Sequence, residues 1–207
     1  MDIFIEPLPS QNPQSETYMV NLFNHRISTT VTATPSVVRR WINQTLHFYR
    51  FHRGRLVVGL GVQWVPSSDE AATLQLCVGS RCLIFQLLHT DTVPLCLRRF
   101  LEDPDHTFVG VWNHRDEELL ESYHNLRVER LIDLRDVADA ELGIGRQVSL
   151  GRLANEVLGF DGVVKDVWVG RSDWGAEWLS EEQVQYACVD AAVSFLVGKE
   201  LEAWNWN

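Results

Sequence analysis

The chain has 207 residues, of which 45% are hydrophobic and 22% charged, and this balance is typical of one globular domain. Its formal net charge of −10 argues against strong, sequence-independent binding along a polyanion, because that binding depends on Lys and Arg at phosphates. No apolar run approaches the ~20 residues that span a bilayer, and the N-terminus lacks the basic start of a signal peptide, so we expect no membrane segment.

The four cysteines form no Cys-x-x-Cys pair and are too few for a disulfide scaffold. We therefore expect them to be small buried side chains in a reducing compartment. This predicts an intracellular protein and leaves nucleus and cytoplasm equally open.

The charges are unevenly distributed along the chain. Residues 17–68 contain no Asp or Glu, and the arginines that fall there are Arg26, Arg39, Arg40, Arg50, Arg53 and Arg55. A basic face beside an acidic body is typical of a protein that meets nucleic acid on one side. Solvated arginines without a partner are an equally open alternative.

The first sixteen residues contain three prolines and several polar residues, which predicts a loose N-terminal arm ahead of one domain spanning 17–207. Residues 18–23 and 26–32 each favour a strand, with a turn at Asn24-His25. A helix is expected after them, with Thr34 as N-cap and Pro35 at its first position.

Residues 55–64 form an aliphatic run that predicts a buried strand. Two more strands are expected at 71–78 and 81–87, joined by a Gly79-Ser80 turn. Helices then alternate with short strands, the helices being expected at 94–101, 115–123, 134–140, 150–158 and 180–204, and the strands at 107–111 and 128–132. This order predicts an α/β domain with a mixed sheet flanked by helices.

Three segments in this order resemble the motifs of the DEDD 3′–5′ exonucleases of the tyrosine subtype, the ribonuclease D and Werner-exonuclease group. They are Gly59–Trp64, Phe108–Asp116 and Tyr186–Asp190. The resemblance implies a ribonuclease-H-like fold and places Asp116, Tyr186 and Asp190 in the catalytic set. The first family motif ends Gly-Leu-Asp-x-Glu-Trp, so Gly61 and Gln63 stand where the family has its Asp and Glu.

The resemblance also implies a cofactor, Mg²⁺ or Mn²⁺, held by four carboxylates, with the tyrosine orienting the attacking water. Hard dications prefer carboxylate oxygens, so Asp116 and Asp190 alone should bind metal weakly or not at all. Asp69 and Glu70 follow the strand and could substitute for the missing carboxylates, although Pro66-Ser67-Ser68 before them favours a solvated loop. Tyr186 and Asp190, four positions apart, are expected on one face of a helix.

Trp64, Arg53 and Arg55 are the candidate nucleic-acid contacts, with Trp64 and Tyr186 flanking a terminal nucleotide; Trp64 as a plain core residue is equally open. Trp112 and Trp174 could stack on bases, but buried roles are favoured. His114 and His124 lack a third ligand in register for zinc, and Cys188 lacks a base that would activate it.

Three functions follow from these residues. The first is a catalytically impaired exonuclease-like domain that binds single-stranded or 3′-end nucleic acid or a protein partner. The second is an active metal-dependent 3′–5′ exonuclease on DNA or RNA, and the third is a scaffold protein without nucleic-acid contact. The oligomeric state and any protein partner stay open.

Overall fold

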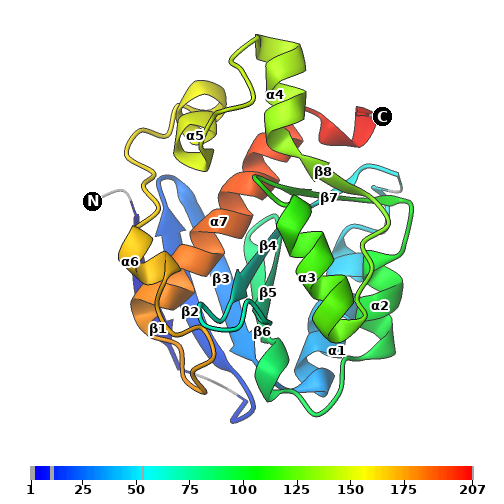
Figure 1. The fold of residues 1–207 in the computed structure, drawn as a ribbon. Helices are drawn as coiled ribbons and strands as arrows, with labels where there is room; N and C mark the ends of the chain where they lie inside the picture. The colour runs from blue at the N-terminus through cyan, green and yellow to red at the C-terminus, as the bar shows by residue number, and fades with distance from the viewer. Residues whose placement is uncertain (1–2, 10–11, 53, 207) are drawn as a thin grey trace.

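The computed structural model describes residues 3–9, 12–52 and 54–206. Their core is a mixed eight-stranded sheet with the order β1-β2-β3-β6-β5-β4-β7-β8 (Figure 1). The strands are β1 (Ile3–Leu8), β2 (Glu16–Leu22), β3 (His25–Thr32), β4 (Leu56–Trp64), β5 (Ala71–Val78), β6 (Arg81–Gln86), β7 (His106–Gly110) and β8 (Leu131–Asp133). β3 pairs in parallel with β6, and β7 pairs in parallel with both β4 and β8, whereas the other neighbours are antiparallel.

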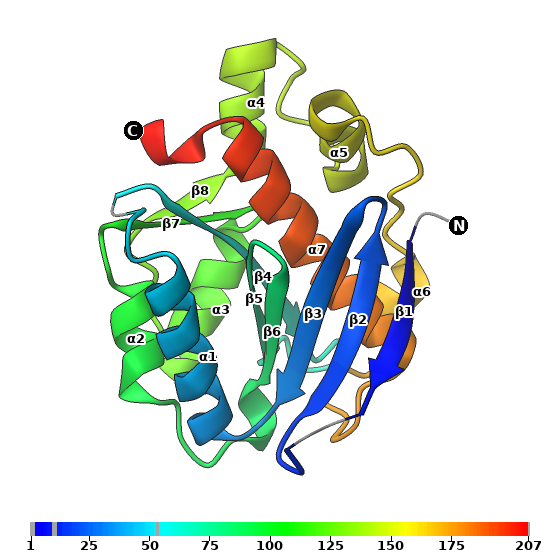
Figure 2. The same ribbon diagram turned by 180° about the vertical axis from the view of Figure 1, so that it is seen from behind.

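Helices cover both faces of this sheet. They are α1 (Pro35–Phe48), α2 (Leu95–Leu101), α3 (His114–His124), α4 (Leu134–Leu142), α5 (Leu150–Leu158), α6 (Val167–Gly170) and α7 (Glu181–Glu200), with 3₁₀ turns η1 (Leu87–His89) and η2 (Ala203–Asn205). The two opposite views place α7 and α3 on one face and α1 and α2 on the other (Figures 1 and 2). The predicted mixed sheet flanked by helices is confirmed.

The prediction of a loose N-terminal arm is wrong for the strand β1. Residues 3–8 pair antiparallel with β2 along their whole length, from Ile3 opposite Leu22 to Leu8 opposite Thr17. Ile3 and Ile5 are half-buried and lie against the core, while Phe4 between them is exposed, which is the alternation of a strand. Pro7, the proline within β1, is tolerated because β1 is an edge strand, where a missing N–H need not face a partner.

The remaining elements lie close to their predicted positions, with local differences. Thr34 precedes α1 and its carbonyl accepts the N–H groups of Val37 and Val38, but its side chain makes no cap hydrogen bond. The predicted helix at 180–204 ends earlier, at Glu200, because Glu202 adopts a left-handed conformation with φ 48°. The single turn α6 has no counterpart in the prediction, since four residues give no periodic pattern.

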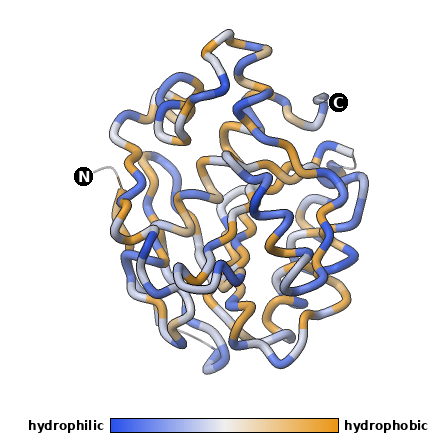
Figure 3. Tube along the Cα trace, in the orientation of Figure 1, coloured by the Kyte–Doolittle hydropathy of each residue, from blue (hydrophilic) through white to orange (hydrophobic). Residues whose placement is uncertain are grey.

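The long helix α7 lies directly on β4, and a glycine makes this approach possible. A Cβ placed on Gly59 would lie 1.8 Å from the carbonyl oxygen of Ala191, so only glycine fits there. β4 is almost wholly buried, and α7 buries the face that it turns toward the sheet; Figure 3 shows hydrophobic residues concentrated in the central strands. The close contact fixes the face of α7 that is turned toward the end of β4.

The cysteines in the structure are free thiols, and Cys77, Cys82 and Cys188 are buried, as expected. Among the described residues no helix combines the length and apolar character needed to cross a bilayer.

Candidate active site

The site lies at the C-terminal end of β4, in the middle of the sheet. β4 runs between β5 and β7, and Gly61 stands opposite Gln75 of β5 in the antiparallel register. α7 covers this strand and α3 begins just beyond the neighbouring strand β7. The fold therefore brings together the strand and the two helices that carry Gly61, Asp116 and Asp190.

The absent side chain at Gly61 leaves a space between a carboxylate and an amide. A Cβ built on Gly61 would lie 3.4 Å from Oδ2 of Asp190 and 3.0 Å from Oε1 of Gln75. Gln75 is fully buried; its Nε2 donates to Oγ1 of Thr73 at 2.5 Å, whereas its Oε1 has no hydrogen-bond partner. An orphaned buried amide oxygen is costly, so this oxygen marks a place that is incompletely satisfied.

The carboxylate of Asp190 is paired with an ammonium group. Nζ of Lys165 lies 2.6 Å from Oδ1 of Asp190, and the Asp190 side chain is only 13% exposed, against 41% for Lys165. Burial lowers the pKa of Lys165, but the charge and hydrogen bond of Asp190 together with the charges of Tyr186 and Asp116 outweigh burial, so the pKa lies above its usual value. The ammonium therefore stays charged and neutralises the carboxylate.

Asp116 lies in the same electrostatic environment, in the first turn of α3. Its side chain is buried, and burial raises its pKa well above the usual range; the charge of Asp190 adds to the rise and Lys165 opposes it. The charges of Asp190 and Lys165 thus act on Asp116, as expected of groups that lie near one another.

Tyr186 precedes Asp190 by one turn on α7 and faces the same side, as predicted. Its ring centroid lies 5.7 Å from Nζ of Lys165 and 5.9 Å from the ring of Trp174. The hydroxyl lies against α6, since a Cβ on Gly170 would come within 2.8 Å of it. Burial raises the pKa of Tyr186, and Lys165 opposes this shift.

A cavity of about 300 Å³ lies beside Lys165, Tyr186 and Asp190, between α7 and the segment 162–169. Its volume is at the lower end of the range for small-molecule sites. Glu182 and Gln185 line it further along α7.

The downstream acid Asp69 does not stand in for a missing carboxylate. Its Oδ2 lies 2.7 Å from Nη2 of Arg115, and both side chains are about half exposed. The same guanidinium lies 5.3 Å from the ring of Trp64. Asp69 is thus the exposed partner of an arginine that also covers Trp64, as the solvated-loop alternative predicts.

Two of the three predicted nucleic-acid contacts, Arg55 and Trp64, do not lie in one site. Arg55 immediately precedes β4 and Trp64 ends it. Nine strand residues extend over about 26 Å between Leu56 and Trp64, so the arginine and the tryptophan lie at opposite ends of the sheet. Arg53 lies outside the described residues.

Trp174, Trp112 and Cys188 pack against other parts of the fold. Trp174 is buried and its Nε1 donates to the carbonyl of Gly170. Trp112 is 45% exposed in a left-handed conformation with φ 61°, and the guanidinium of Arg135 stacks 3.3 Å from its ring centroid. Cys188 is buried and accepts from Oγ1 of Thr29 at 3.1 Å.

Lys165 and Gln75 were missed by the sequence analysis. Lys165 lies in an irregular segment 25 positions from Asp190, and no periodic pattern connects them. Gln75 is one polar residue within a buried strand, and this is the one signal that could have drawn attention to it.

The site offers few acidic side chains that could bind a metal ion. Within the part of the chain that the structure describes, no group of three or more His, Cys, Asp or Glu side chains could hold a metal ion. Nε2 of His124 contacts the carbonyl oxygen of Ala71 at 2.7 Å.

Comparison with known proteins gives a consistent result. A family model described as 3′–5′ exonuclease matches residues 62–203. The mouse bifunctional 3′–5′ exonuclease/ATP-dependent helicase WRN is 30% identical over 151 residues, which cover 70% of this chain and 11% of WRN. The chain spans less than two thirds of the length of each of the first curated relatives that it matches.

Solved structures agree with this match. Escherichia coli RNase D superposes with a TM-score of 0.70 at 21% identity, covering 84% of this chain and 44% of RNase D, and it confirms the fold. The EXD2 exonuclease domain, solved after soaking in Mn and dGMP, has a TM-score of 0.50 at 25% identity and covers 84% of this chain and 89% of that domain.

Proposed function

Since this chain belongs to the 3′–5′ exonuclease family, we propose that it is an exonuclease-like domain that binds nucleic-acid ends but hydrolyses them poorly or not at all. The family provides the fold and the position of the site. Two departures within the site support the proposed loss of hydrolysis: the residues at positions 61 and 63, and the ammonium on Asp190.

One observation carries the proposal, namely the contact between Lys165 and Asp190 beside the empty side-chain position of Gly61. The family resemblance implies that Asp190 is a metal ligand, yet its Oδ1 lies 2.6 Å from an ammonium. A dication near Asp190 would have to displace that ammonium, which costs the existing ion pair, or lie beside it, where the two cations repel each other.

The residues present do not fit a pair of divalent ions. Asp116, Asp190 and Lys165 together have a formal charge of −1 when both acids are ionised, and Gln63 provides only a neutral amide. Mg²⁺ loses water reluctantly and usually needs carboxylates to remain bound. The orphaned Oε1 of Gln75 adds one further neutral oxygen, which does not replace a carboxylate. Any Mg²⁺ or Mn²⁺ would therefore bind weakly, and we assign no hydrolytic step to this site.

The binding of nucleic acid does not require metal ligands, because aromatic rings and cations at the surface can contact bases and phosphates. Trp64 at the end of β4 has the half-exposed guanidinium of Arg115 over its ring, which places an aromatic ring and a cation side by side. Bases stack on such faces and arginines contact phosphates. We assign these residues, with Tyr186, to the binding of a 3′ end.

The experiment that tests this proposal measures cleavage and binding on the same protein. A 5′-labelled 3′-recessed DNA duplex and a single-stranded RNA are incubated with Mg²⁺ and with Mn²⁺. Wild-type protein should shorten neither substrate above the background of Asp190→Ala, while fluorescence anisotropy at low salt shows that the oligonucleotides bind. Shortening from the 3′ end that Asp190→Ala abolishes would establish an active exonuclease. Flat anisotropy would instead refute the binding role.

A further inference from the structure

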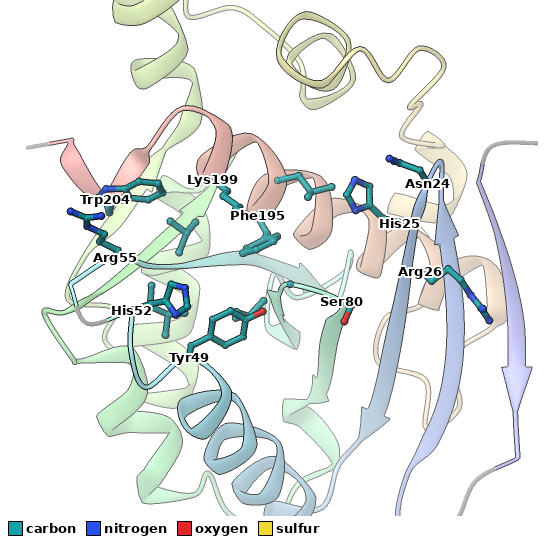
Figure 4. Close-up of a pocket in the computed structure, with 15 residues that line it drawn as sticks. Asn24, His25, Arg26, Tyr49, His52, Arg55, Ser80, Phe195, Lys199 and Trp204 are labelled. Atoms are coloured by element: carbon teal, nitrogen blue, oxygen red, sulfur yellow. The ribbon is translucent and has the colours of Figure 1, made fainter.

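The largest feature that the exonuclease site leaves unexplained is a cavity at the other end of the sheet. It has a volume of about 480 Å³ and lies where β4 begins and α7 ends, between Leu56 and Val57 of the strand and Phe195 and Lys199 of the helix (Figure 4). Its size falls within the range of small-molecule sites. The candidate active site lies near Gly61 and Trp64, toward the opposite end of β4.

The charged groups at this cavity are all cationic. Arg26, Arg55 and Lys199 line it, and no Asp or Glu of the described chain does. None of the three takes part in an ion pair between described residues, and all three are exposed. Unpaired cations at a cavity favour an anionic ligand, although the protein as a whole has a net charge of −10.

Aromatic rings form part of the remaining walls, beside aliphatic residues of β4 and α7. Tyr49 and Trp204 line the cavity together with Phe195, and the imidazoles of His25 and His52 add two more flat rings. Figure 4 shows Arg55 beside Trp204, and Phe195 directed from α7 toward Tyr49 and His52. The rings of Tyr49 and His52 meet edge to face with centroids 5.6 Å apart. Aromatic faces of this kind stack on planar heterocycles.

The surroundings indicate which part of the cavity attracts an anion. Asp103 and Asp105 line an adjoining groove that shares Tyr49, His52 and Leu56 with the cavity. Arg55, Lys199 and Trp204 do not line that groove, so an anionic group is expected on their side of the cavity.

We propose that this cavity is a second ligand site, which binds a nucleotide with its phosphate at Arg55 and Lys199 and its base against Trp204 and Tyr49. The combination of unpaired cations and aromatic faces in one cavity of this volume fits a phosphorylated planar base. The nucleotide is either free or one unit of a single strand, since both have the same chemistry. The site does not depend on the loss of hydrolysis at Asp190, because it shares no residue with that site.

The test compares two charge-matched double variants of the full chain. Arg55→Glu with Lys199→Glu removes the two cations of the cavity, and Arg39→Glu with Arg99→Glu makes the same charge change at exposed residues of α1 and α2 outside it. Binding of AMP and of inorganic phosphate is measured by calorimetry, and binding of a fluorescent single-stranded oligonucleotide by anisotropy. A third variant, Trp204→Ala, removes an aromatic wall. Thermal unfolding checks that each variant is folded.

We expect the cavity double variant to weaken AMP binding at least about tenfold, while the control double variant stays within about twofold of wild type. Trp204→Ala should weaken AMP binding but leave phosphate binding unchanged. If only the oligonucleotide shows this pattern, the ligand is a strand and the site is still supported. Phosphate binding as tight as AMP would refute the nucleotide assignment. Equal losses in both double variants, or no loss in either, would refute the site.

Discussion

Restoring the carboxylates at positions 61 and 63 should make the stability of the protein depend on divalent metal. In Gly61→Asp with Gln63→Glu, the new Asp carboxylate lies about 4 Å from that of Asp190, because a Cβ at position 61 is 3.4 Å from Oδ2. Two like charges at this distance repel by about 4 kcal/mol at an effective dielectric constant near 20. Lys165 offsets part of this repulsion. We expect a net loss of about 2–4 kcal/mol in the free energy of unfolding when metal is absent.

A divalent ion should reverse this loss. An ion present at 100 times its dissociation constant stabilises the folded state by about 2.7 kcal/mol, which raises the midpoint of a domain of this size by roughly 5–11 °C. The assay is thermal unfolding in EDTA and in Mn²⁺. Wild type should change by less than about 1 °C, since a site with so few acids gains little from the ion.

Gly61→Asn with Gln63 unchanged is the matched control. It adds nearly the same volume at position 61 without the charge, and thus separates a steric effect at Gln75 from repulsion at Asp190. The reasoning would be refuted if Mn²⁺ raised the thermal unfolding midpoint of wild type by an equal amount. It would also be refuted if Mn²⁺ left the midpoint of the restored variant unchanged.

Two further substitutions test the packing and the ion pair. Gly59→Ala should lower the free energy of unfolding by more than about 3 kcal/mol, because the new Cβ overlaps the carbonyl of Ala191. Gly61→Ala should lower it by less than about 1 kcal/mol, because the close neighbour there is the side chain of Gln75. Urea unfolding measures both losses, and equal losses would contradict the geometry. Lys165→Met should lower the free energy of unfolding by about 1–2 kcal/mol, because it leaves the largely buried Asp190 unpaired. This loss should disappear when Asp190→Asn is added. A loss that persists in the double variant would show that Lys165 acts through packing alone.

Much of the fold could be predicted because local patterns and tertiary structure agree. The aliphatic run of β4 and the Gly79-Ser80 turn gave the central meander, and Ser180 with Gln183 forms the capping box that begins α7. β1 was missed because three prolines outweighed a short alternation of apolar residues, and that alternation is stabilised only once β2 is beside it.

The site was predictable only in part. The motif order brought Asp116, Tyr186 and Asp190 into one neighbourhood, and the electrostatics of the structure agree. The ion pair of Lys165 depends on the path of an irregular segment, which no periodic pattern encodes. The grouping of Arg55 with Trp64 overlooked the length of an extended strand, which separates the two ends of β4.

The central claim is that Asp116 and Asp190 do not hold a pair of divalent ions, and Mn²⁺ binding tests it most directly. Free Mn²⁺ is followed by electron paramagnetic resonance as wild type, Asp190→Asn and the restored Gly61→Asp, Gln63→Glu variant are titrated. The Kd of wild type for Mn²⁺ should be no lower than about 1 mM, and Asp190→Asn should give a similar Kd. The restored variant should have a lower Kd than either. Two Mn²⁺ ions bound by wild type at micromolar concentration, and released in Asp190→Asn, would contradict the account.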